Sequence, residues 1–172
     1  MSSERIPKIR VGGIKLSREL VQVDVTGQQG DGFPAASLLA GMTREKINMT
    51  YLTASFVGLP TAASFCVAAA DFDQVRMLID SDPDLARRVR THASVGALTV
   101  FPHRSDLRLL GILFGALSEA KCPVYGMASS ISTLTLTTSY WSIGRALQAL
   151  ESVLDLPVNH SPYRQEFLVR QV

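Results

Sequence analysis

The chain has 172 residues, of which 47% are hydrophobic and 19% are charged, and its formal net charge is +2. This balance is typical of a globular protein with a buried core, and the scattered Lys and Arg residues give no footprint of a nucleic-acid binder. No apolar run reaches the ~20 residues that span a bilayer, and the start, MSSERIPKIR, lacks the apolar centre of a secretory signal. Cys66 and Cys122 lie in apolar segments without metal-ligand spacing, so we expect reduced core thiols in a cytoplasmic protein.

The first half of the chain predicts the order strand, helix, strand, strand, helix. Residues Leu20–Thr26 alternate in polarity, which is typical of a strand with one apolar face. A glycine-rich loop follows, and Phe33–Lys46 then predicts a helix. Ile47–Ser55 and Ala63–Ala70 predict two further strands, and Asp71 is a good N-cap for the second helix.

The second half predicts the same order of elements. Val95–Phe101 is expected to be a strand, and Leu107–Lys121 a strongly apolar helix. Two strands, Val124–Ile131 and Thr133–Thr138, and a helix over Trp141–Leu154 complete the series.

The two halves also match in register. The segment EKINMTYLTAS begins at Glu45, and AKCPVYGMASS, of similar form, begins at Ala120, a displacement of 75 (120 − 45 = 75). The predicted hairpin of the second half is shorter than that of the first, so beyond it the displacement falls to 69 (141 − 72 = 69). At this displacement Trp141, the only tryptophan, corresponds to Phe72, which predicts a packing role for Trp141. Agreement of element order and core positions at one displacement indicates a doubled unit.

Each βαββα half needs one more strand to complete a ferredoxin-like βαββαβ sandwich. Only one strand-like run, Ala93–Phe101, lies between the halves, whereas Glu166–Val172 is a spare strand at the C-terminal end. We therefore predict an α+β protein with two ferredoxin-like units in tandem, the second inserted in the first. Unit one comprises residues 1–92, closed by 163–172, and unit two comprises residues 93–162.

The residues expected of a catalytic site are sparse. His92, His103 and His160 are far apart in sequence, and no GxSxG, HExxH, CxxC or Walker motif is present. Ser129 and Ser130 follow a strand without an identifiable base. We therefore predict no catalytic residues, no metal and no cofactor, and no enzyme activity.

The loop Gly27–Pro34 (GQQGDGFP) is the one stretch with the features of a binding site. It leads into a helix N-terminus, whose N–H groups and dipole favour an anion such as the carboxylate of an amino acid. Asp31 could meet the ammonium group of the same molecule. A plain glycine-rich turn remains the structural alternative, and the second half has FPHRSDL at this place, without the glycines.

Two runs, VGGIKLSRELVQVDVTG and GDGFPAASLLAGMTREKINMTYLTAS, resemble the regulatory region of aspartokinases, which consists of tandem ACT domains. SVGALTVFPHRSDLRLLGILFGALSEAKCPVYGMASS resembles the second ACT domain of the pair. The likeness covers about Val11 to Leu154 and leaves no room for a kinase domain, so it implies a stand-alone regulatory or sensor protein.

The resemblance also implies where an effector would bind. In the family, an amino acid sits between the first loop and helix of one ACT domain and a neighbouring strand. The corresponding residues here are Gln29, Gly30, Asp31, Gly32 and Phe33 in the loop, and Asn48, Met49, Thr50 and Ser55 on the strand. Thr50 stands where lysine-sensitive members often have an aspartate, so the resemblance does not imply lysine as the effector.

Two functions are consistent with these features of the sequence. The first is a non-catalytic sensor that binds a small molecule, which the resemblance implies to be an amino acid, forms a homodimer through its ACT units and signals to a protein partner. The second is a dimerising adaptor that has lost ligand binding. A small enzyme would need an acid/base pair that the sequence does not offer. We expect no nucleic acid as a partner, since no interleaved Arg and aromatic residues mark the middle strands, and no membrane, since no apolar run is long enough to span one.

Overall fold

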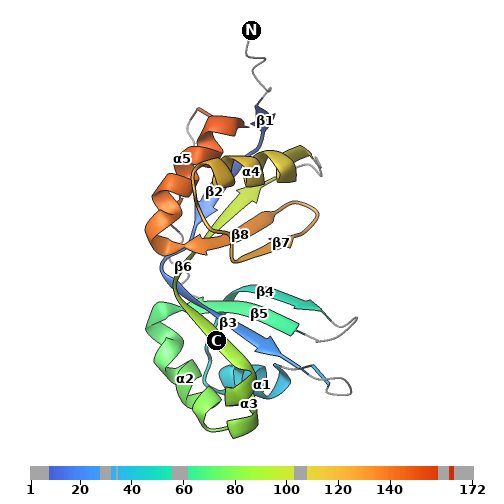
Figure 1. Cartoon of the computed structure of the whole chain (residues 1–172), viewed down its shortest axis with the longest axis vertical. Helices are drawn as coiled ribbons and strands as arrows, with labels where there is room; N and C mark the ends of the chain where they lie inside the picture. Colours follow the sequence, from blue (N-terminus) through green and yellow to red (C-terminus); the bar gives the residue numbers. More distant parts are fainter. Residues whose placement is uncertain are drawn as a thin grey trace. The chain divides into compact units, whose positions relative to one another are not determined.

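The protein is mixed α/β and forms two compact units. The computed structural model describes residues 8–27, 32–33, 35–55, 62–102, 108–158 and 163–164 (Figure 1). The continuous unit is Arg18–Val95, and the split unit combines the described parts of Met1–Ser17 and Gly96–Gln165. Within the described ranges, no helix is long and apolar enough to cross a membrane.

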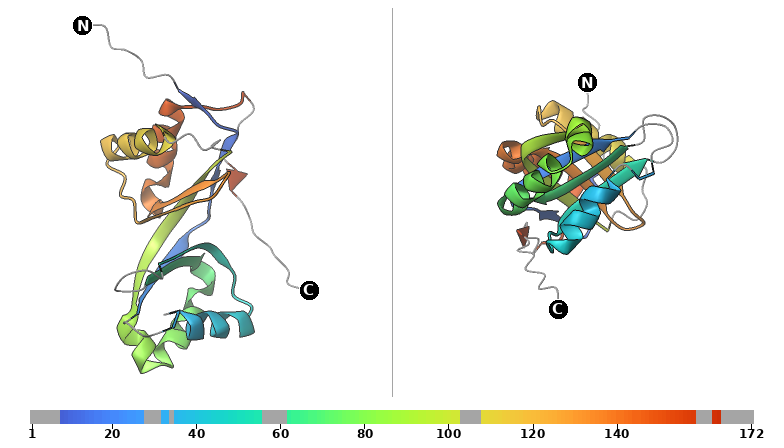
Figure 2. Two further views of the ribbon diagram at one scale, coloured as in Figure 1. Left: turned by 90° about the vertical axis from the view of Figure 1, so that its right-hand side faces the viewer. Right: turned by 90° about the horizontal axis from the view of Figure 1, so that it is seen from below.

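The continuous unit has one antiparallel sheet with the strand order β6–β3–β5–β4. The helices lie together on one side of this sheet (Figures 1 and 2). Its elements are β3 (Leu20–Thr26), α1 (Ala36–Arg44), β4 (Met49–Ser55), β5 (Ala62–Ala68), η1 (Ala69–Asp71), α2 (Phe72–Asp80), α3 (Pro83–Arg88) and the first part of β6 (Val89–Phe101).

The alternation of β3 decides which side of this sheet receives the helices. Val21, Val23 and Val25 point to the helices and are buried, as the sequence pattern predicts. Phe65 and Val67 of β5 lie on the same side, opposite Val23 and Val21. These side chains and the inner faces of α1, α2 and α3 form one core, whose burial stabilises the unit.

The split unit has a sheet with the order β10–β2–β6–β8–β7 and a short parallel pair, β1–β9. Figure 2 shows α4 and α5 together on one side of the β7–β8 hairpin. The elements are β1 (Ile9–Arg10), β2 (Gly13–Leu16), the rest of β6, α4 (Arg108–Glu119), β7 (Gly126–Ser129), β8 (Leu134–Ser139), η2 (Tyr140–Ser142), α5 (Ile143–Val153), β9 (Leu154–Asp155) and β10 (Tyr163–Arg164). Apolar residues of both helices pack against the sheet as a second core.

Strand β6 explains why the structure divides the chain differently from the prediction. It is 13 residues long and begins at Val89, upstream of the predicted start. Residues Val89–Val95 pair with β3, and residues Leu98–Phe101 pair with β2. One strand therefore serves both units, whereas Glu166–Val172 was predicted to close unit one. The fourth strand of the split unit is β2 from the N-terminal segment, whereas the predicted closing strand, Glu166–Val172, lies outside the described residues.

The ends of α1 and α4 repeat the same backbone geometry. Lys46 and Lys121 both have positive φ, 57° and 54°, and lie 75 residues apart (121 − 46 = 75). After each, an N–H reaches back to the helix: Ile47 to the Met42 carbonyl, and Cys122 to the Leu117 carbonyl. This is the Schellman ending of a helix, in which glycine normally occupies the positive-φ position. Its recurrence agrees with the predicted displacement of the repeat.

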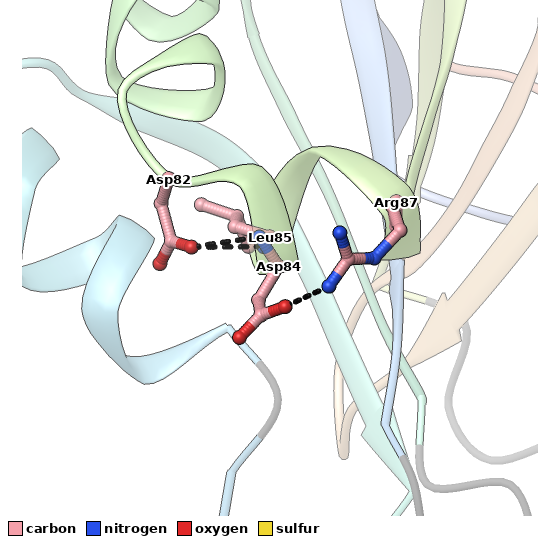
Figure 3. Close-up of polar contacts among 4 residues, drawn as sticks. All are labelled: Asp82, Asp84, Leu85 and Arg87. Carbon is pink, nitrogen blue, oxygen red and sulfur yellow. Dashed lines mark hydrogen bonds and ion pairs between the residues drawn. The ribbon is translucent and has the colours of Figure 1, made fainter.

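Two local predictions were wrong. Asp71 occupies the N-cap position of α2, but its side chain makes no capping hydrogen bond. The side chain that caps a helix here is Asp82, which accepts the N–H groups of Asp84 and Leu85 at the start of α3 (Figure 3). Trp141 is 82% exposed and does not have the predicted packing role, because η2 carries it outward at the end of β8.

Candidate functional site

The predicted effector site falls on the segments that flank α1 in the continuous unit. Gly32 and Phe33 precede the helix, and Met49, Thr50 and Ser55 lie in β4 after it. Asn48 was predicted to lie on this strand but lies directly before it. Gly32 is exposed, whereas Phe33 packs against the core as a partly buried side chain. Gln29, Gly30 and Asp31 lie outside the described residues.

The N-terminus of α1 has neither a side-chain cap nor an acidic residue in its first turn. Ala35 occupies the N-cap position and offers no side-chain acceptor. The Ala36 N–H donates to the Phe33 carbonyl at 3.0 Å. The first turn thus presents helix-dipole N–H groups without a side-chain anion of its own, which favours a bound carboxylate.

The strand side of the predicted site is an edge of the sheet. β4 pairs with β5 alone among the described strands, and it contains no charged residue from Met49 to Ser55. Met49 lies opposite Val67 and Tyr51 opposite Cys66, so Thr50 is one extra residue, a β-bulge. The Thr50 hydroxyl donates to the Cys66 carbonyl at 3.4 Å.

The bulge changes which side chains of β4 share a face. Leu52 lies opposite Phe65, a residue of the helix-side core, and Met49 lies opposite Val67 of the same core. Met49 and Leu52 therefore both point to the helix side, although they are three residues apart. They are 41% and 45% exposed, so they form an apolar surface beside the core. Asn48 is half-buried, and Ser55 is exposed at the far end of the strand.

A polar cluster that the sequence analysis did not single out lies on the other face of the same sheet. Asp24 of β3 accepts hydrogen bonds from Ser64 Oγ at 2.6 Å and Gln22 Nε2 at 3.1 Å, both through Oδ1. His92 Nε2 lies 3.1 Å from Asp24 Oδ2. Gln22 is 2% exposed, although it points to the face of the sheet opposite the helices of the continuous unit. The alternation in Leu20–Thr26 places Gln22 and Asp24 together. His92 was not expected beside them, because the strand that contains it was predicted to start after it.

The geometry of this cluster does not resemble a nucleophilic centre. The Ser64 hydroxyl donates to a carboxylate, and Asp24 separates it from the imidazole of His92. A serine nucleophile needs a base within reach of its own hydroxyl, with the carboxylate behind that base. The cluster is better explained as a polar network that joins β5, β3 and β6.

Burial also controls the ionisation of two neighbouring side chains. Burial raises the pKa of the Cys66 thiol to about 12, and the negative charge of Asp24 adds to this shift. Burial raises the pKa of Tyr51 as well; the hydrogen bond with Thr53 opposes the shift, and the charges of Cys66 and Asp24 reinforce it. Cys66 and Cys122 are free and buried, as predicted. Cys66 is therefore a protonated, unreactive thiol at neutral pH.

Comparison with solved structures identifies the fold. The ligand-free regulatory subunit of aspartate kinase from Thermus thermophilus matches with a TM-score of 0.71 at 14% identity, over 84% of this chain and 99% of that subunit. A structure of the aspartokinase alpha and beta subunits matches with a TM-score of 0.72 at 16% identity, over 83% of this chain and 97% of that chain. This chain has the fold of an aspartate kinase regulatory subunit.

The same fold forms part of complete kinases. E. coli aspartokinase III in complex with lysine and aspartate matches with a TM-score of 0.62 at 16% identity, over 89% of this chain but 34% of that enzyme. The matched part is thus about a third of the enzyme's length. No protein-family model matches the chain, and no curated protein matches its sequence.

Proposed function

We propose that this chain is a non-catalytic regulatory protein that binds an amino acid and responds through its assembly. In this proposal the continuous unit is an ACT-type βαββαβ module closed by β6, and the split unit is a second such module, in which β2 from the N-terminal segment takes the place of the last strand. The observation that carries this proposal is the match to nearly the whole length of aspartate kinase regulatory subunits. The two buried, free cysteines suit the reducing conditions of the cytoplasm.

The effector site of this proposal lies in the continuous unit, between the loop before α1 and strand β4. Its residues are Gln29, Gly30, Asp31, Gly32, Phe33, Asn48, Met49, Thr50 and Ser55. The α1 N-terminus would receive the carboxylate, because its first turn lacks an acidic residue and a side-chain cap. Asp31 would receive the ammonium group, since β4 contains no carboxylate.

The composition of β4 favours an effector with an uncharged side chain. A second ammonium, as in lysine, would need a second carboxylate when desolvated, and Thr50 offers only a hydroxyl that already donates to the Cys66 carbonyl. Met49 and Leu52 instead offer apolar contacts on the helix side of the strand.

A thermal-shift screen of the full chain against the twenty amino acids tests this function. A ligand that binds only the folded state raises the melting temperature, so we expect a rise with a small number of amino acids. Asp31→Ala should abolish the rise, whereas Asp80→Ala, which removes an exposed acid at the end of α2, should preserve it. A rise that survives Asp31→Ala would remove Asp31 from the site.

A flat response to all twenty amino acids would favour the second candidate, an adaptor that dimerises without a ligand. The engagement of the Thr50 hydroxyl by the backbone and the absence of charge along β4 are the observations on its side. The chain would then be expected to form the same assembly with and without amino acids, as measured by light scattering.

A further inference from the structure

Trp141 and Arg145 lie one helical turn apart in the split unit, where β8 leads through η2 into α5. Trp141 is 82% exposed, and Arg145 is exposed as well. Residues four apart on a helix are neighbours on its surface, so the indole and the guanidinium belong to one patch. Tryptophan and arginine are among the residue types that most often dominate the binding energy of protein interfaces.

Tyr140 supports the exposed indole. The rings of Tyr140 and Trp141 meet edge to face, with centroids 6.2 Å apart and planes at 71°. Tyr140 itself packs on β6, because a Cβ at Gly96 would lie 3.3 Å from its Cδ2 atom. A side chain that is supported in this way loses less conformational entropy when a partner covers it, which suits a contact surface.

The corresponding aromatic residue of the continuous unit is placed differently. With the displacement of 69, Trp141 corresponds to Phe72 and Arg145 to Arg76 (145 − 76 = 69). Phe72 is half-buried and packs against the core of its unit, whereas Trp141 projects outward. The aromatic side chain at this position therefore contributes to the core in one unit and to the surface in the other.

The two corresponding arginines also differ in their partners. The Arg76 guanidinium donates to the Asp73 carboxylate at 2.8 Å. Ser142 stands in the place of Asp73 (142 − 73 = 69), and its hydroxyl accepts from Arg145 Nη2 at 3.0 Å. The same nitrogen lies 3.5 Å from the Lys121 carbonyl. Within the part of the chain that the structure describes, Arg145 thus has only uncharged partners, and the exposed Lys121 adds a second positive charge beside it.

We propose that Trp141 and Arg145 form the docking site for a segment of a partner protein that presents a carboxylate beside an apolar side chain. The carboxylate would take the place at Arg145 that Asp73 takes at Arg76, and the apolar side chain would cover the indole. The inference rests on the proposed regulatory function, since such a protein acts on a partner, but it does not require an effector.

The exposure and charge of the patch decide between kinds of occupant. Small-molecule sites are concave and bury most of their ligand, whereas Trp141 lies on the outer surface. A partner protein can cover such a side chain, and an aromatic residue buries about 150–250 Å² in the process. A two-fold contact with a second copy would bring Arg145 and Lys121 of both copies together, and a basic segment would meet the same repulsion. An acidic segment is complementary to both cations.

The test compares the binding of three short labelled peptides to the full chain by fluorescence anisotropy. Each peptide has two leucines in a background of glutamate, serine or lysine, so only the charge differs. We expect the glutamate peptide to bind with a Kd below about 1 mM, and the other two about tenfold more weakly or worse. Emission from Trp141, the only tryptophan, should shift to shorter wavelength as the glutamate peptide covers the indole.

Three variants and a matched control locate the site. Arg145→Glu should weaken binding of the glutamate peptide about tenfold or more, and Trp141→Ala should do so without changing the melting temperature. Ser142→Asp should also weaken it, because it gives Arg145 the carboxylate partner that Arg76 already has. Arg76→Glu makes the same change as Arg145→Glu at the corresponding position of the continuous unit and should leave the Kd unchanged.

Several results would overturn the inference. The first is no saturable binding of the glutamate peptide up to about 1 mM, and the second is equal binding of the serine peptide. The third is a Kd that neither Arg145→Glu nor Trp141→Ala changes. A Trp141 emission that shifts with protein concentration, in step with the molar mass, would instead make a second copy the occupant. The amino-acid thermal-shift screen is a separate test: a shift seen with the wild type should persist in Arg145→Glu, because the proposed effector site lies in the continuous unit.

Discussion

Replacing Asp82 by alanine tests how strongly one side chain holds α3 in place. The helix has only six residues, too few to form without help from its surroundings. Asp82 Oδ1 accepts the N–H of Asp84 at 3.0 Å and that of Leu85 at 3.1 Å (Figure 3). Leu85 is buried in the core of the continuous unit, and β6 begins directly after the helix. The cap therefore fixes a helix that leads straight into the closing strand of its unit.

The magnitude follows from the two hydrogen bonds. Loss of an aspartate N-cap costs about 1 kcal/mol, within a range of roughly 0.5–2, and Asp82→Ala should fall in the upper half because two N–H groups lose their acceptor. For a chain of this length, 1 kcal/mol corresponds to a fall in melting temperature of about 2–4 °C. Arg87→Ala is the control: it removes the ion pair with Asp84, whose side chains are 72% and 66% exposed, and such a pair contributes about 0.2–0.5 kcal/mol.

Urea unfolding and amide hydrogen exchange provide the two readouts. We expect the Asp84 and Leu85 amides of Asp82→Ala to exchange faster, with the loss of protection extending into the first residues of β6. Asp82→Asn should restore most of the protection, because asparagine caps helices about as well as aspartate. If Arg87→Ala cost as much as Asp82→Ala, or if the Leu85 amide kept its protection without the cap, the capping argument would be refuted.

Two further predictions concern the repeated helix endings and the buried thiol. Lys46→Gly and Lys121→Gly should each stabilise the chain by roughly 0.5–1 kcal/mol in urea unfolding, because glycine adopts positive φ without the steric cost of a side chain; a loss of stability would contradict the assigned backbone geometry. The pKa of Cys66 is raised from 9.0 to about 12 in the folded state, so its contribution to stability is complete below pH 9 and is lost as the pH rises towards 12. Cys66→Ala should flatten this decline in unfolding free energy, leaving the smaller contribution of Tyr51, whose pKa burial raises in the same direction, and an unchanged decline would refute it.

Most of the candidate site follows from local sequence, but its shape does not. The glycine-rich loop before a helix could be recognised from residue types alone, and so could the two strands after it. The bulge at Thr50 could not, because it arises from how β4 pairs with β5 rather than from the β4 sequence. That bulge decides that Met49 and Leu52 share a face, and hence which side chains could contact a ligand.

The polar network around Asp24 shows the same limit. Alternation in β3 predicts that Gln22 and Asp24 point away from the valines, as they do. Ser64 and His92 come from strands 40 and 68 residues later in the chain (64 − 24 = 40; 92 − 24 = 68). Their approach to Asp24 depends on the order β6–β3–β5, which no short-range pattern contains.

By itself, the sequence determined the order of the main strands and helices from Leu20 to Val153 and the buried face of Leu20–Thr26, and it predicted a doubled unit at a displacement of 75 residues. These properties depend on periods of two and 3.6 residues and on helix endings, which act over a few residues. Only the tertiary structure decided that β6 serves both units, that Asp82 rather than Asp71 caps a helix, and that Trp141 is exposed. The physical reason is that strand pairing and burial are properties of residues brought together from distant parts of the chain, so local patterns leave them open.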